Sequence, residues 1–199
     1  MPRVNHVKHA RLPTKCGRCG RAIEKGDPYL WAKTRYGPKL VRCPDHSFRA
    51  SELTSSDKLS NLYSAQEDVE DEVKAVRDLL ARSDFGHAEL LEALRSLGDT
   101  LENSASQAEE TGSEYQESAD AVDEYFPGSS QVDEITEKAE AAEEFSSELT
   151  DKAGDARSLI EELEALEINE DGEALGELPV DEVESLLDEV EGTTSGLSI

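Results

Sequence analysis

Three cysteines and one histidine near the N-terminus have the spacing of metal ligands. Cys16 and Cys19 are separated by two residues, and Cys43 and His46 repeat this spacing after a gap of 23 residues. Two ligands at this spacing fit on one tight turn, and two such turns can complete a tetrahedron around one ion. The four residues therefore predict a closed structural zinc site, with no position left open for water or a substrate.

Other interpretations of these residues are open. A Cys-x-x-Cys redox motif needs a βαβ context, which the surrounding sequence lacks, and it leaves Cys43 and His46 unexplained. Unrelated surface thiols are a second alternative, whereas an odd number of cysteines argues against a disulfide framework. The identity of the fourth ligand is also open, because His6 and His9 have the same spacing. We favour His46, because it follows Cys43 at the spacing of the first pair.

The residues between the two pairs predict the strands that bring the ligands together. The segment "DPYLWAKTR" (27–35) favours a strand, "YGP" (36–38) a turn, and "KLVRC" (39–43) a returning strand. A short hairpin of this kind carries Cys43 back beside the first ligand pair. The predicted fold is a zinc ribbon or a small treble clef, depending on whether a helix starts directly after His46.

The same region carries candidate contacts to nucleic acid. These cationic and aromatic residues are Arg18, Arg21, Trp31, Lys33 and Arg35. If residues 29–35 form a strand, alternation places Tyr29, Trp31, Lys33 and Arg35 on one face. Rings stack on bases and cations neutralise phosphates, which favours a nucleic-acid surface. The alternative is that Trp31, the only tryptophan of the chain, belongs to the core of the small domain.

The charge of the chain is divided between two parts. Residues 1–50 contain 12 Lys and Arg against 3 Asp and Glu, whereas residues 51–199 contain 8 against 43. Adaptation to high salt would acidify both parts, so it explains this division poorly. The basic part suits nucleic acid or an acidic protein partner. No apolar stretch is long enough to span a membrane and no signal peptide is evident, so we expect a cytoplasmic protein.

Downstream of the basic part, apolar residues recur every three or four positions, which is typical of helices that pack along one face. The first such helix is predicted over 55–125, with a bend favoured near 83–87 because the heptad register continues through Gly86. The second is predicted over 131–167, after the breaking sequence "FPGSS", and its many alanines suit an antiparallel hairpin. Residues 168–199 predict a linker, a short acidic helix and a flexible tail. This short helix packs on its own coiled coil or docks into a partner's groove, and both alternatives are open.

Three segments carry a resemblance to known proteins: "MPRVNHVKHAR", "IEKGDPYLWAKTRYGPK" and "SELTSSDKLSNLY". Together they resemble a family of small bacteriophage and prophage proteins of unassigned function. In that family a short basic N-terminal domain, with or without the zinc cysteines, precedes acidic helices. The similarity covers roughly residues 1–65. It implies a virus-encoded protein that acts in the host cytoplasm, and it implies no activity.

These observations predict a mainly α protein, with a basic zinc-binding β domain over 1–54 followed by acidic helices. No residues form a catalytic constellation, so we expect no enzyme and no small-molecule substrate. We expect a zinc-binding adaptor whose basic domain contacts nucleic acid or an acidic partner. Its helices would mediate assembly, as a homo-oligomer or with a protein partner. The alternatives are a purely structural coiled-coil protein with a zinc-stabilised cap, and an acidic inhibitor of a nucleic-acid enzyme.

Overall fold

The computed structural model describes residues 2–35, 37–82, 84–169, 174 and 176–197. The chain divides into two compact units, residues 1–64 and residues 65–199. The first unit contains all the strands of the described residues, and the second is built from helices. The expected fold class, mainly α with a small N-terminal β domain, is confirmed.

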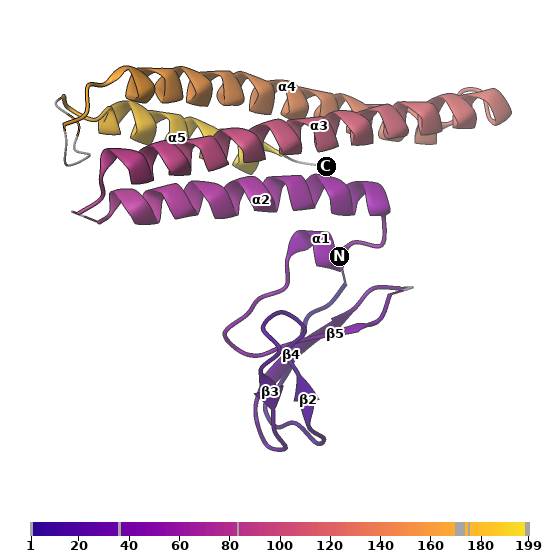
Figure 1. The fold of residues 1–199 in the computed structure, drawn as a ribbon. Helices are drawn as coiled ribbons and strands as arrows, with labels where there is room; N and C mark the ends of the chain where they lie inside the picture. The colour runs from indigo at the N-terminus through magenta and orange to yellow at the C-terminus, as the bar shows by residue number, and fades with distance from the viewer. Residues whose placement is uncertain (1, 36, 83, 170–173, 175, 198–199) are drawn as a thin grey trace. The chain divides into compact units, whose positions relative to one another are not determined.

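The first unit contains two small antiparallel sheets (Figure 1). The larger sheet has the strand order β1, β4, β5, with bounds Asn5–Val7, Tyr29–Lys33 and Lys39–Arg42. The smaller sheet pairs β2 with β3, with bounds Thr14–Lys15 and Ala22–Ile23. The β4–β5 hairpin lies where aromatic and β-branched residues on either side of a Gly-Pro turn predicted it. The turn between β2 and β3 holds the first cysteine pair, and β5 ends directly before Cys43.

The cross-strand register gives the β4–β5 hairpin two different faces. Trp31 lies opposite Val41 and Lys33 opposite Lys39, so these side chains share a face, whereas Ala32 points to the other face and is fully buried. Tyr29 and Val41 pack against a small core, whose buried residues are Ala10, Cys16, Ile23 and Cys43. Half of this core consists of metal-ligand candidates, so apolar packing alone gives the unit little stability.

Two helices follow the ligand region. Helix α1 is a single turn, Ala50–Leu53, and α2 runs from Asp57 to Leu80. The hydroxyl group of Ser56 caps α2, because it accepts a hydrogen bond from the N–H of Leu59 at 3.4 Å. Since the first helix begins only at Ala50, no helix follows His46 directly. By the criterion given above, this favours a ribbon, with both ligand pairs on turns, over a treble clef.

Four helices pack side by side in the second unit (Figure 1). They are α2 from residue 65 onward, α3 (His87–Tyr125), α4 (Ser130–Ala165) and α5 (Val180–Gly196). Successive helices run antiparallel, and buried serines join them: Ser104 donates to the carbonyl of Ala65 at 3.3 Å, and Ser146 to that of Ala105 at 2.8 Å. The apolar residues at heptad spacing form the core, and those without measurable exposure include Val69, Val76, Leu90, Leu94, Leu97, Leu101, Leu149 and Leu163.

The chain reverses direction between α2 and α3, where the sequence favoured a bend in one long helix. Helix α2 ends at Leu80 and α3 starts at His87, and the carboxylate of Glu89 accepts the Gly86 N–H at 3.3 Å. The heptad register continues through this turn because both helices contribute to the same core. Periodicity therefore does not distinguish a bend from a turn. Ser83, the first residue of the predicted bend, lies outside the described residues.

Helices α3 and α4 form a long antiparallel hairpin, as their small residues predicted. The connection falls within "FPGSS", where Gly128 has a φ of +74° and the Ser129 hydroxyl accepts the Gln131 N–H at 3.3 Å. The two helices approach closely at Gly112, where a Cβ atom would lie 3.4 Å from the carbonyl oxygen of Ala139. Small residues are therefore needed along this contact.

The short acidic helix α5 packs on its own chain, which settles the alternatives that the sequence left open. Its apolar residues Val183, Leu186, Leu187 and Val190 are all buried. On its polar side, Asp188 pairs with Arg77 of α2 at 2.6 Å, and Glu189 pairs with Lys152 of α4. The apolar face of α5 is thus part of the core of the bundle.

Candidate metal centre

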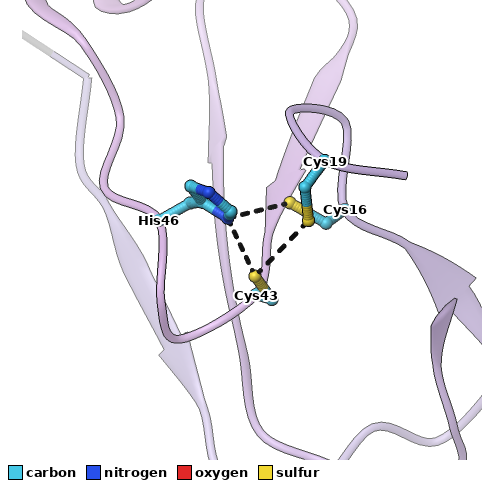
Figure 2. Close-up of side chains that lie close together, drawn as sticks. All are labelled: Cys16, Cys19, Cys43 and His46. Carbon is cyan, nitrogen blue, oxygen red and sulfur yellow. Dashed lines mark hydrogen bonds between the residues drawn. The ribbon is translucent and has the colours of Figure 1, made fainter. Parts of the chain in front are cut away.

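The four predicted ligands lie together in the first unit (Figure 2). The atoms that can bind a metal all lie within 4.8 Å of one another, namely the sulfurs of Cys16, Cys19 and Cys43 and a ring nitrogen of His46. Within the described part of the chain, the alternative ligands His6 and His9 are not members of this cluster. His9 instead places Nδ1 3.1 Å from the carbonyl oxygen of Gly26. The arrangement therefore favours His46 as the fourth ligand.

Each ligand pair lies on a tight turn that backbone hydrogen bonds close. In the first turn the N–H of Gly20 donates to the carbonyl of Cys16 at 2.9 Å, and Gly20 has a φ of +71°. In the second turn the N–H of His46 donates to the carbonyl of Cys43 at 3.0 Å. A residue with a side chain rarely adopts the backbone conformation of Gly20, so the first turn depends on this glycine.

Two contacts join the first turn to the second. The N–H of Gly17 donates to the carbonyl of Val41 at 2.8 Å, on the strand that leads into the second turn. Arg21 pairs with Asp45 at 2.6 Å, and both side chains are exposed. An exposed ion pair contributes little, so the backbone bond is the stronger of these two contacts.

The distances between the ligand atoms suit a tetrahedral ion. Cys43 Sγ lies 3.0 Å from His46 Nδ1 and 4.0 Å from Cys19 Sγ, and Cys16 Sγ lies 3.8 Å from His46 Nδ1. Zinc–sulfur bonds of about 2.3 Å and zinc–nitrogen bonds of about 2.0 Å place such atoms roughly 3.5–3.8 Å apart. The three distances lie within about half an ångström of this range, and the cluster as a whole, which spans 4.8 Å, must contract by about 1 Å to close around an ion. Binding through Nδ1 requires that the ring proton of His46 is on Nε2.

The ionisation of the Cys16 and Cys43 thiols also favours a cation at this place. Burial of the Cys16 thiol opposes its ionisation, but backbone N–H groups of both turns, led by that of Cys19, lower its pKa to about 6. For Cys43, burial and the neighbouring Cys16 and Cys19 raise the pKa. One thiolate therefore forms readily and hinders the next. A divalent cation removes this conflict, because it attracts all three thiolates.

Two of the five candidate nucleic-acid residues lie on the same face of β4. Trp31 is half-buried there and Lys33 is exposed. Lys39 was not among the five candidates, but it shares this face. Its Nζ lies 4.7 Å from the centre of the Trp31 ring and 5.5 Å from the centre of the Tyr29 ring. The register of the predicted hairpin was the signal that could have identified it, because Lys39 pairs with Lys33.

The other three candidates lie elsewhere. Arg18 is exposed within the first ligand turn, and Arg21 follows that turn and pairs with Asp45. The condition under which Arg35 shares the face of Trp31, a strand over residues 29–35, is not met, because β4 ends at Lys33. After this strand, the Thr34 hydroxyl accepts the N–H of Gly37 at 3.0 Å. Strand alternation therefore does not place Arg35 beside Trp31.

Comparisons with protein-family models, curated proteins and solved structures found no match to this chain. Among the described residues, no helix combines the length and the apolar character that crossing a membrane requires.

Proposed function

We propose that this chain is a non-enzymatic zinc-binding adaptor. Its first unit binds zinc structurally and contacts nucleic acid or an acidic partner, and its helices mediate assembly. The observation that carries the proposal is the cluster of Cys16, Cys19, Cys43 and His46 within 4.8 Å. Three thiolates and one imidazole suit zinc, and four protein ligands complete its tetrahedral shell. The resemblance to phage proteins extends this proposal to a virus-encoded protein in a host cytoplasm.

The basic face of the β4–β5 hairpin supports contact with nucleic acid. Lys33 and Lys39 are exposed on this face, and Lys39 Nζ lies 4.7 Å from the centre of the half-buried Trp31 ring. Phosphates attract such cations without regard to base sequence, so binding would be strongly salt-dependent. An acidic protein segment offers similar charges, and it is the second kind of partner for this face.

The end of the α3–α4 hairpin supports the proposed role in assembly. Tyr125 is 73% exposed and Phe126 is 69% exposed, and they are adjacent where the two helices connect. Adjacent exposed aromatic residues are typical of contact sites between proteins. Such a contact would join a second copy of the chain or a protein partner.

One observation favours the structural alternative, in which the zinc-binding part only caps the helices. Tyr29 packs against the core, and Lys39 lies over the rings of Tyr29 and Trp31. In this arrangement the aromatic residues stabilise the sheet and are not free to stack on bases.

Binding of the full-length zinc-loaded chain to a labelled single-stranded oligonucleotide separates these two candidates. We expect salt-dependent binding that Lys39→Glu weakens, with the salt slope reduced by about 1. Lys74→Glu makes the same charge change at an exposed position of α2 and is the matched control. Absence of binding at low salt, or equal losses in both variants, would favour the structural candidate. Fluorescence of Trp31, the only tryptophan, reports whether the sheet face is involved.

A further inference from the structure

Arg42 is a charged side chain in the interior of the first unit. It is the last residue of β5, directly before the ligand Cys43, and only 4% of its surface is exposed. Burying a guanidinium group is costly unless an anion and hydrogen-bond acceptors compensate for the lost water. The partners of Arg42 therefore indicate what its burial accomplishes.

These partners come from a segment after the metal centre. Arg42 Nη2 donates to the Glu52 carboxylate, and its guanidinium carbon lies 5.3 Å from the centre of the Phe48 ring. Nη1 donates to the carbonyl of Val41 at 3.0 Å, while the buried Nε has no hydrogen-bond partner among the described residues. Within that part of the chain, Glu52 is the carboxylate that balances this buried charge.

The guanidinium also lies against the first ligand turn. A Cβ atom on Gly17 would be 2.7 Å from Arg42 Nη1, which is closer than side-chain atoms approach one another. Gly17 is the residue between Cys16 and Arg18, so Arg42 packs on the backbone that presents the first ligand pair. Because Arg42 itself precedes Cys43, this single residue packs on the first ligand turn and leads directly into the second.

On its other side, Glu52 connects Arg42 to the helices. The second oxygen of its carboxylate accepts the N–H of Arg49 at 3.0 Å, at the start of α1. Helix α1 is joined in turn to α2, because the Ser60 hydroxyl donates to the carbonyl of Ser51 at 3.0 Å. A continuous series of contacts therefore runs from the ligand turns through Arg42 and Glu52 to the first turns of α2.

We infer that Arg42 and Glu52 are a positioning pair that couples metal binding to the order of α1 and residues 57–64 of α2. The inference depends on the metal centre proposed above and adds a consequence to it. When the metal holds the first turn in place, Arg42 is held against Gly17 and keeps Glu52 at the start of α1. Coupling of this kind is reciprocal, so the same contacts increase metal affinity.

The zinc affinity of the full-length chain tests this coupling, measured by competition with a chromophoric chelator. We expect Glu52→Gln to weaken zinc binding by about 10-fold, the loss typical of a residue that orients metal ligands. Arg21→Gln is the matched control, because the exposed Arg21–Asp45 pair also joins the two ligand turns but contributes little. If Glu52→Gln fails to fold, Glu52→Asp keeps the charge with a shorter side chain and should show a smaller loss in the same direction.

Hydrogen exchange distinguishes coupling from a merely local role. In the wild-type chain, zinc should slow amide exchange in residues 57–64. In the Glu52 variants, measured at saturating zinc so that the metal stays bound, this slowing should be lost. If Glu52→Gln and Glu52→Asp bind zinc as tightly as the wild type, the coupling is overturned and the metal centre stands. The same holds if zinc slows exchange equally with and without Glu52. Failure of the wild-type chain to bind zinc would overturn both.

Discussion

The two units of this chain are stabilised in different ways. The first contains a small core cluster of four buried residues, of which two are cysteines of the metal cluster. The second buries leucines and valines of four helices along continuous faces. A small β unit cannot bury enough apolar surface to be stable alone, and ligand–metal bonds supply what packing lacks. The helical unit has no such need, because its apolar residues recur along each helix.

The units also differ in charge. Residues 1–50 carry an excess of Lys and Arg, whereas residues 96–137, which include the end of the α3–α4 hairpin, contain 12 Asp and Glu and no Lys or Arg. Opposite charges placed on separate units allow each to select a different kind of partner. The difference between the units therefore predicts which perturbations affect one unit and spare the other.

Removal of the metal should have the largest effect, and it should be confined to the first unit. Apparent binding free energies of structural zinc are about 10–16 kcal/mol at neutral pH, so a chelator should unfold the β unit. We expect a changed Trp31 fluorescence spectrum together with an almost unchanged helical signal in far-ultraviolet circular dichroism. Loss of most of the helical signal would contradict the separate stabilisation of the two units.

The reverse perturbation is a cavity in the helical core. Leu94 has no measurable exposure, so Leu94→Ala should cost about 2–5 kcal/mol in thermal or denaturant unfolding of the bundle. Zinc content should remain that of the wild type. Release of zinc by this variant, under conditions in which the bundle is still folded, would contradict the separate stabilisation of the two units.

The pH dependence of zinc binding should belong to the first unit alone. Metal binds thiolates, and the pKa of Cys43 is raised, so zinc must displace its proton at neutral pH. Apparent affinity should therefore increase with pH, by about tenfold per unit for each proton displaced. Below pH 6 the dependence should become steeper, because the pKa of Cys16 is lowered only to about 6 and this thiol then binds a proton as well. Calorimetric titration in buffers of different ionisation enthalpy counts the protons released, and an affinity independent of pH would exclude thiolate ligation.

Two glycine substitutions should have small effects of opposite sign. Gly20→Ala forces a side chain into a backbone with φ of +71° and should destabilise the zinc-loaded first unit by about 1–2 kcal/mol. Gly154 lies within α4 with open space around its Cα, so Gly154→Ala should stabilise the bundle by about 1 kcal/mol. Thermal unfolding followed by Trp31 fluorescence for the first unit and by circular dichroism for the second measures the two effects separately. If both substitutions stabilised their units, or both destabilised them, backbone conformation would not explain the effects.

The spacing of the ligands and the period of the helices were readable from the sequence because both are local. Cys16 with Cys19, and Cys43 with His46, each need only one turn to face a common point, and the hairpin between them follows from turn residues. The reversal between α2 and α3 was not readable, since a shared core continues the heptad register through a turn. The packing of α5 was left open for a related reason, because an apolar face does not specify which surface covers it.

The contacts of Arg42 were not predicted either. In the sequence, an arginine directly before a cysteine is one more cation of a basic segment. Only the fold brings Glu52 and Gly17 next to the Arg42 side chain. Lys39 is an intermediate case, because the hairpin register places it beside Lys33 once the strands are known. Residues whose roles depend on partners distant in sequence are thus the ones that sequence patterns miss.

Native mass spectrometry of the full-length chain shows whether the four ligands hold a metal. After exposure to zinc and removal of excess metal, we expect one zinc ion per chain, and none in Cys43→Ser. A wild-type chain that retains no metal, or a Cys43→Ser chain that retains zinc as well as the wild type does, would contradict this expectation.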